Sequence, residues 1–330
     1  MISRILTLLI LLPLWAAPAG EMNSTILIGK SRLDIVVEKG QFDLSKEGLL
    51  DWIRSAAESV TTYYGHFPVP HALIRIAPGE GRGIRHGMTF GRGGGLITIH
   101  VGAETTPAGF QSDWMLTHEM IHLAFPSMSE EHHWIEEGIS TYVEPIARVR
   151  TKHMDVSEMW YELVRDLPQG LPAPGDRGLD HTHTWGRTYW GGALFCFLAD
   201  LEIRRQTESK KGLEDALRGI LDAGGDIRRD MSLDDALTLG DGAVGGSVLK
   251  TLYGRMKDTP VDVDLPDLWE KLGVKVIDRQ VQFNDRAPLA ATRKAITYGT
   301  PQPTAGADTP LKSHTVFAGR TSSLRPSRNE

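Results

Sequence analysis

Cysteine is almost missing from this sequence, since Cys196 is the only one among 330 residues. A lone cysteine excludes an internal disulfide framework and any zinc site built from several cysteines. Positive charge is not in excess either, because 36 lysines and arginines stand against 42 aspartates and glutamates, for a formal net charge of −6. Nucleic acids and anionic lipids both attract basic patches. We therefore expect no nucleic acid and no lipid surface as a partner.

An apolar run long enough to span a membrane is missing as well. The run from Ile5 to Trp15 falls well short of the roughly 20 residues that a spanning helix needs. Arg4 precedes it, and Ala17-Pro18-Ala19 follows with small residues at the spacing that a signal peptidase recognises. We expect residues 1–19 to be a cleaved signal peptide. The mature protein should then be exported, to the periplasm or by secretion, without a membrane anchor.

The local sequence patterns change at about residue 105. Before this point lie extended stretches rich in β-branched residues, interrupted by one amphipathic helix expected at residues 44–64. The glycine-dense residues 79–95 are expected to form a hairpin or a mobile loop before the last strand. The extended stretches read STILIG, LDIVVE, LIRIAP and LITIHV.

From residue 106 onward the pattern is helical, and Cys196 lies in an apolar helix where it should pack as a small hydrophobic residue. Pro145 should end or kink the second of these helices. The helices are expected at residues 112–125, 131–144, 157–165, 187–205, 213–222 and 248–256. Residues 300–330 have few large apolar side chains and are expected to be a disordered tail. The predicted fold class is α+β, with a β-rich part at residues 20–105 packed on a mainly helical part at residues 106–299.

The sequence THEMIH places Glu119 between His118 and His122 in the pattern His-Glu-x-x-His. On a helix, side chains four residues apart share one face at a separation of about 5–6 Å, so two imidazoles can bind one cation. Glu119 would lie close enough to hold a metal-bound water without being a ligand. Because the pattern is short, a polar helical hairpin without metal is the alternative.

A catalytic zinc needs a third protein ligand and an open fourth position. The next helix carries HWIEEGISTYVE, in which His132, His133, Glu136 and Glu137 have suitable chemistry. Glu136 and Glu137 point about 100° apart on a helix, so we expect only one of them to be a ligand.

THEMIH followed by WIEEGISTYVE resembles the gluzincin metallopeptidases, the clan of thermolysin and the membrane alanyl aminopeptidases. In the aminopeptidase branch the second helix reads approximately W-x-x-E-G-F-A-x-Y-x-E, and the glutamate before the glycine is the third zinc ligand. The matching residues are Trp134, Glu137, Gly138, Tyr142 and Glu144. The resemblance thus implies a Zn²⁺ held by His118, His122 and Glu137. The short interval from His122 to Glu137 is closest to the glycyl aminopeptidase-like branch.

The downstream segment RTYWGGALFCFLADLEI resembles the aminopeptidase segment that reads Y-x-K-G before a long apolar helix. The tyrosine of that segment supports the transition state, and Tyr189 takes its position, although Gly191 replaces the lysine. Tyr189 as a packing residue is the alternative. His181 or His183 would then do the same electrophilic work, as a histidine does in thermolysin-like members.

The strand expected in GGGLITIHV takes the place where gluzincins pair a substrate peptide along a sheet edge. The Gly-x-Met-Glu-Asn motif, with which alanyl aminopeptidases hold the free amine of the substrate, is missing from the sequence. That absence argues against strict aminopeptidase activity.

The resemblance implies a zinc peptidase of zincin type, with the His-Glu-x-x-His helix at a cleft between the two parts, and the predicted signal peptide implies that it is exported. Glu119 would take a proton from the zinc-bound water, which would then attack a peptide or protein substrate. A non-catalytic, peptidase-derived binding or chaperone module and a zinc hydrolase of a non-peptide substrate are the alternatives.

Overall fold

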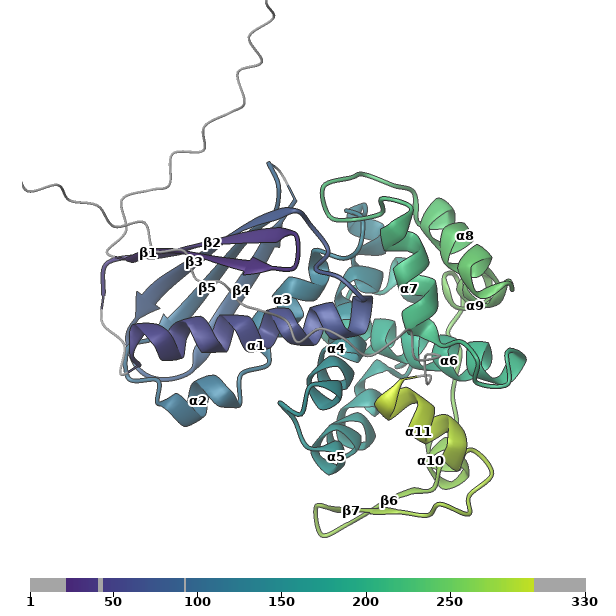
Figure 1. Cartoon of the computed structure of the whole chain (residues 1–330). Coiled ribbons are helices and arrows are strands. Elements are labelled where there is room, and N and C mark those ends of the chain that lie inside the picture. The colour runs from purple at the N-terminus through teal and green to yellow at the C-terminus, as the bar shows by residue number, and fades with distance from the viewer. Residues whose placement is uncertain (1–21, 41–43, 92, 300–330) are drawn as a thin grey trace, which may run out of the picture.

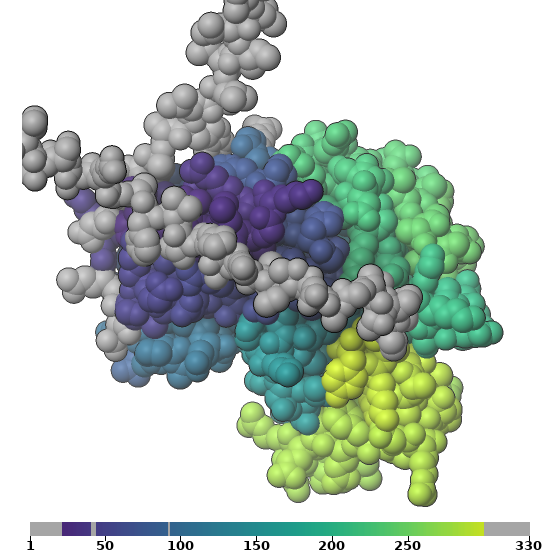
Figure 2. All heavy atoms as spheres, viewed as in Figure 1, coloured from purple at the N-terminus to yellow at the C-terminus, as the bar shows by residue number. Residues whose placement is uncertain are grey.

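The computed structural model describes residues 22–40, 44–91 and 93–299 of the chain. The signal peptide predicted at residues 1–19 and the tail predicted at residues 300–330 lie outside these ranges. The described chain is of mixed α+β type, as the sequence predicts, with the five-stranded sheet in the N-terminal part and most of the helices after it in the sequence (Figure 1). In the space-filling view the purple and blue N-terminal region lies beside the green and yellow helical region (Figure 2).

The sheet has five strands in the order β1-β2-β3-β5-β4. β2, β3 and β5 run parallel to one another, whereas β1 and β4 pair antiparallel with their neighbours. The strands are β1 Met22–Ile28, β2 Ser31–Val37, β3 His71–Gly79, β4 Ile84–Phe90 and β5 Leu96–Gly102. β-branched residues such as Ile35, Ile74 and Ile99 are almost fully buried between the sheet and its cover, which is where their shape packs best.

All four β-branched stretches of the sequence fall in strands, and residues 79–95 supply the hairpin that joins β4 to β5. The expectation that β5 forms the sheet edge is wrong. β5 pairs with β3 on one side and β4 on the other, so β4 is the edge strand.

Helix α1 (Lys46–Tyr64) runs across the sheet and connects the parallel strands β2 and β3 (Figure 1). It begins where the Ser45 side chain accepts a hydrogen bond from the Gly48 amide, and it ends at Gly65, whose φ of 85° suits glycine. Its buried face includes Leu50, Ile53 and Val60, which join the core of the sheet.

The second region is built mainly from helices that share one continuous core with the sheet. The helices are α2 Pro107–Gln111, α3 Met115–His122, α4 His133–Arg150, α5 Val156–Asp166, α6 Gly192–Gln206, α7 Leu213–Asp222, α8 Leu233–Val244, α9 Val248–Met256, α10 Leu265–Leu272 and α11 Ala290–Tyr298. Short 3-10 or π-helical turns are η1 Glu130–His132, η2 Leu167–Gly170, η3 Leu179–His181 and η4 Arg187–Gly191, and a hairpin is formed by β6 Val274–Ile277 and β7 Gln280–Phe283. Cys196 is buried in α6, as predicted.

Pro145 does not end α4, which continues to Arg150. A proline in a helix interior costs about 3 kcal/mol, because it lacks an N–H and crowds the preceding turn. Val143, Ile146 and Val149 around it are buried, and each large apolar side chain contributes about 1.5–3 kcal/mol on burial. Their packing outweighs the cost of the proline.

Within the described ranges, none of the helices has both the length and the hydropathy needed to cross a membrane.

Candidate metal centre

Helix α3 carries the His-Glu-x-x-His pattern and is shorter than the sequence suggests. It begins at Met115, where the carboxylate of Asp113 accepts hydrogen bonds from the amides of Met115 and Leu116. Leu116 and Met120 are fully buried, which anchors the helix in the core. The side chains of His118, Glu119 and His122 line a cleft of about 770 Å³.

Helix α4 is fixed against α6 by two glycines that leave no room for side chains. A Cβ added to Gly138 would lie 2.3 Å from the Cα of Gly192, and one added to Gly192 would lie 2.1 Å from the carbonyl oxygen of Trp134. This close backbone contact determines the position of Glu137, the residue before Gly138.

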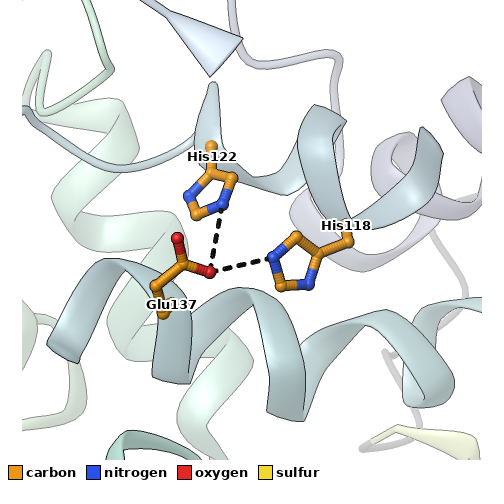
Figure 3. A group of neighbouring side chains, drawn as sticks. All are labelled: His118, His122 and Glu137. Atoms are coloured by element: carbon orange, nitrogen blue, oxygen red, sulfur yellow. Dashed lines mark hydrogen bonds and ion pairs between the residues drawn. The ribbon is translucent and has the colours of Figure 1, made fainter. Parts of the chain in front are cut away.

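His118, His122 and Glu137 point toward one another across the gap between α3 and α4 (Figure 3). Oε2 of Glu137 lies 3.1 Å from Nε2 of His118 and 3.7 Å from Nε2 of His122. Zinc–ligand bonds of about 2.1 Å at a tetrahedral angle separate two ligand atoms by about 3.4 Å. The two measured distances bracket this value. Two imidazoles and a carboxylate are also a donor set that suits a catalytic zinc.

Burial of His122 and hydrogen bonds to Glu137 keep these two groups in the protonation states that bind a cation. It lowers the pKa of His122 to about 3, so this imidazole is neutral and has a free lone pair at neutral pH. Burial alone would raise the pKa of Glu137, but hydrogen bonds with His118 and His133 hold it well below its usual range. A neutral imidazole and an ionised carboxylate are the forms that bind metal.

Glu119 is held beside these residues by the edge strand β4. The hydroxyl of Thr89 donates to Oε2 of Glu119 at 2.6 Å. The backbone of β4 comes so close at Gly87 that an added Cβ would lie 2.6 Å from Oε1 of Glu119. Burial raises the pKa of Glu119, although the Thr89 hydrogen bond acts in the opposite direction. A raised pKa suits a carboxylate that must both accept and release a proton.

Ser140 supports His122 from behind, because its Oγ lies 3.2 Å from Nδ1 of His122. With Nε2 free for a metal, Nδ1 carries the proton and donates to Ser140, which fixes the orientation of the ring. Neither Asp113 nor Glu144 makes such a bond. Asp113 accepts from backbone amides at the start of α3, and Glu144 pairs with Arg148 at 2.9 Å.

The other candidate ligands of the second helix, His132, His133 and Glu136, are not members of the group formed by His118, His122 and Glu137. Glu136 accepts a hydrogen bond from the Met128 amide, and its other oxygen lies 3.4 Å from His133. His133 also reaches the outer oxygen of Glu137, Oε1, at 3.3 Å. His132 turns the other way, toward Tyr253 and Asp180.

Tyr189 lies in the π-helical turn η4, which replaces the regular helix start expected from the sequence. Its ring stacks 6.3 Å from that of His118, and it lines the same cleft. Burial, together with the negative charges of Glu137 and Glu119, raises the pKa of Tyr189 to about 12, so its hydroxyl remains a donor. His181 instead pairs with Asp258 at 2.8 Å, and neither His181 nor His183 belongs to the cleft lining.

Two contributing residues, Thr89 and Ser140, were not predicted from the sequence. Thr89 comes from a glycine-dense segment with no motif, 30 positions before Glu119. Ser140 had a weak signal, since it lies one helical turn after Glu137 on a buried helix where an alanine would serve for packing.

No protein-family model and no curated protein matches this sequence. The solved structures that it resembles include an aminopeptidase N family protein and M1 zinc metallopeptidases. An aminopeptidase N family protein from Idiomarina loihiensis matches with a TM-score of 0.58 and 14% identity, over 81% of this chain and 53% of that one. At this identity the similarity concerns the fold alone.

An M1 zinc metallopeptidase from Deinococcus radiodurans matches with a TM-score of 0.46 and 16% identity, over 73% of this chain and 54% of that one. A mutant of that enzyme bound to a Tyr-Ser-Ala substrate matches with a TM-score of 0.48 and 16% identity, over 74% and 53% of the two chains. The chain therefore spans about half the length of these structures.

Proposed function

We propose that this protein is a zinc-dependent peptidase in which His118, His122 and Glu137 hold the metal. One observation carries the proposal. Three suitable donor atoms meet beside the partly buried carboxylate of Glu119, in a cleft with an edge strand as one wall. The similarity of the fold to that of an aminopeptidase N family protein supports the same reaction class.

Zinc bound at these residues would lower the pKa of a water toward about 7 and polarise the carbonyl group of the substrate. Glu119 would accept the proton that this water loses and would pass it to the nitrogen of the departing amine. Thr89 keeps the carboxylate of Glu119 in one orientation during both transfers. The hydroxyl of Tyr189 donates a hydrogen bond to the carbonyl oxygen as negative charge builds on it.

A peptide substrate fits the wall that β4 provides. β4 has a pairing partner in the sheet only on the side of β5, and the cleft lining includes residues 85–91 of this strand. An extended peptide can add to such an edge through main-chain hydrogen bonds. We propose that the substrate lies antiparallel or parallel along β4, with its scissile bond beside Glu119.

Export is part of the same proposal and depends on the leader predicted at residues 1–19. The N-terminal sequence of the protein isolated from its host tests this, since cleavage would leave a chain that begins near Gly20.

The decisive experiment compares two variants that separate the proton transfer from metal binding. Glu119→Gln should retain stoichiometric zinc and lose about 10²–10⁴-fold in turnover of a peptide library, because it removes the base and leaves the ligands intact. Glu137→Ala should lose zinc instead, because it removes a ligand. Metal analysis after gel filtration and chelator-sensitive peptide cleavage give the two readouts.

Glu136→Ala is the matched control, since Glu136 is the neighbouring carboxylate and bonds to Met128 and His133. It should retain zinc. Loss of zinc from Glu136→Ala but not from Glu137→Ala would show that the ligands are assigned wrongly. A wild-type protein that takes up no zinc would remove the proposal altogether, and turnover of esters without turnover of peptides would favour a non-peptide hydrolase.

A further inference from the structure

A second cavity opens beside the candidate metal centre. It has a volume of about 300 Å³ and shares the side chains of Trp114, His118 and Tyr189 with the cleft. Small-ligand pockets span about 300–1,000 Å³. A cavity at the lower end of this range suits one side chain of a substrate bound in the cleft.

Aromatic rings form the wall of this cavity that faces the metal centre. The ring of Trp114 lies 5.6 Å from that of His118, and Trp185 stacks on Tyr189 at 5.6 Å. Trp114 and Trp185 are also exposed, at 49% and 61%, which is unusual for so large an apolar side chain. Exposed indole faces at the mouth of a cavity attract cations as well as apolar groups.

The charged side chains on α4 and α5 indicate whether a cation or an apolar group suits the cavity better. Arg148 is paired with Glu144, and Arg165 with Asp166, so both arginines of the cavity lining are already engaged by neighbouring side chains. Glu158 and Glu162 remain. Among the described residues, neither carboxylate has a hydrogen-bond or ion-pair partner.

Glu162 is partly buried in this position, and its surroundings do not favour its negative charge. Burial raises its pKa, and the charge of Glu158 raises it further, although Arg165 acts in the opposite direction. A cation in the cavity would stabilise the ionised Glu162 carboxylate against both its burial and its repulsion by Glu158. Aromatic walls with two unpaired carboxylates are therefore complementary to an amine or guanidinium on an apolar stem.

We propose that this cavity is a specificity subsite for a lysine or arginine side chain of the peptide substrate. The inference rests on the proposed peptidase function, because it assumes that a substrate backbone lies in the adjoining cleft. The structure leaves both residues that flank the scissile bond as candidates for the side chain that enters.

Cleavage of matched peptides tests the subsite. Peptides that differ only in lysine, norleucine or glutamate, placed in turn on each side of the scissile bond, are compared by kcat/KM. At one of the two positions lysine should exceed norleucine about tenfold, with glutamate the poorest. Glu158→Gln/Glu162→Gln should reduce the lysine preference about tenfold, as expected for two charge pairs of about 0.7 kcal/mol each. Cleavage of the norleucine peptide should change less than twofold.

Glu270→Gln serves as the control, since Glu270 is exposed on α10 and lines neither the cleft nor the cavity. It should leave the lysine preference unchanged. The single variant Glu162→Gln, with an expected loss of about threefold to fivefold, replaces the double variant if the latter does not fold. Equal cleavage of lysine and norleucine peptides at both positions, or a preference that survives the double variant, would overturn the inference.

A direct binding measurement separates this inference from the proposed function. Acetyl-lysine-amide should quench the tryptophan fluorescence of the zinc-loaded Glu119→Gln protein saturably, and acetyl-norleucine-amide should bind at least fivefold more weakly. This result without any peptide cleavage by the wild type would support the subsite and reject the peptidase. Cleavage without selective binding of the lysine probe would reject the subsite and leave the peptidase standing.

Discussion

At the scale of single residues, Glu137 shows how neighbours prepare a carboxylate for one role. Its inner oxygen, Oε2, faces His118 and His122, whereas its outer oxygen, Oε1, faces His133. Hydrogen bonds to Glu136 and Glu137 raise the pKa of His133 to about 10, so this histidine is a cation at neutral pH. Because Oε1 of Glu137 is paired with the cationic His133, only Oε2 remains to face His118 and His122. We expect Glu137 to bind metal through Oε2 alone.

Tyr189 supplies a hydroxyl where negative charge would develop on the substrate. Tyr189→Phe removes only this donor, so kcat should fall by about 10²–10³-fold while KM and zinc content stay nearly unchanged. Steady-state kinetics with a single peptide and metal analysis of the same preparation check this. Tyr253→Phe is the control, because the hydroxyl of Tyr253 donates to Asp180 outside the cleft lining. An unchanged kcat for Tyr189→Phe would make Tyr189 a packing residue.

Glu144 predicts a pH dependence of stability. Burial raises its pKa to about 7, even though Arg148 acts in the opposite direction. The folded protein thus holds a proton on Glu144 at pH values where the unfolded chain, with an ordinary pKa, has released it. Stability from this group is fully present below about pH 4.5 and is lost as the pH rises toward 7. The expected loss is of the order of 3 kcal/mol, from a shift of about 2.5 pH units.

Urea unfolding of the metal-free protein at several values between pH 5 and 8 measures this effect. Glu144→Gln cannot titrate, so the difference in unfolding free energy between wild type and variant should shift in favour of the variant as the pH rises. Other titrating groups cancel in this difference. A difference that stays constant with pH would show that Glu144 is ionised throughout the range.

At the scale of elements, the sequence predicts what depends on local patterns. The β-branched stretches became β1, β2, β3 and β5, and the amphipathic stretch at residues 44–64 became α1, because both patterns record which side chains face the core. The spacing of His118 and His122 placed both on one helical face for the same reason. That Glu137 would lie beside these two histidines could be predicted only from the family resemblance, because it depends on how α3 and α4 pack.

Features that depend on tertiary contacts escaped prediction. β4 forms from a glycine-dense segment because β5 offers it a pairing edge, and its contact with Glu119 at Gly87 and Thr89 cannot be read from residues 84–90 alone. The π-helical turn at Tyr189 likewise directly precedes a tertiary contact, because the next residue after the turn, Gly192, packs against α4. The expected sheet edge was wrong for a similar reason, because strand order is a property of the whole sheet.

The contact of α4 with α6 gives a prediction at this scale. Gly138→Ala would place a methyl group 2.3 Å from backbone atoms of Gly192, which no side-chain rotation can relieve. We expect a loss of at least about 1–3 kcal/mol in unfolding free energy, with a displacement of Glu137 that weakens zinc binding. Thermal unfolding and zinc titration measure the two effects.

Gly254→Ala is the matched control on α9, where an added Cβ meets no atom within 4 Å. It should stabilise the protein by about 0.5–1 kcal/mol, since alanine is the better helix former. If Gly138→Ala had the same unfolding free energy as the wild type, α4 and α6 could move apart without destabilising the protein.

At the scale of the whole molecule, a buried network of charges joins the helix that carries Glu137 to the later helices. Arg204 on α6 bonds to both oxygens of Glu214 on α7 and to Asp200 on its own helix. Glu214 also pairs with Arg150, the last residue of α4. Charges this deeply buried need their partners, because an unpaired one has lost its water without replacement.

The last prediction concerns Arg204, which is 1% exposed. Arg204→Ala leaves Asp200 buried without its cation and Glu214 with Arg150 alone, and should lower the unfolding free energy by about 3–5 kcal/mol. Arg205→Ala is the neighbouring control: the Arg205 side chain is 68% exposed and pairs only with Glu202 among the described residues, so this variant should unfold at nearly the same urea concentration as the wild type. Urea unfolding followed by tryptophan fluorescence compares the two. Because the network joins α4 to α6 and α7, loss of zinc should coincide with unfolding of these helices in Arg204→Ala. If zinc were lost at a urea concentration well below that at which the helices unfold, the metal centre would not depend on this network. Equal stability of the two variants would show that water reaches the charges left by Arg204.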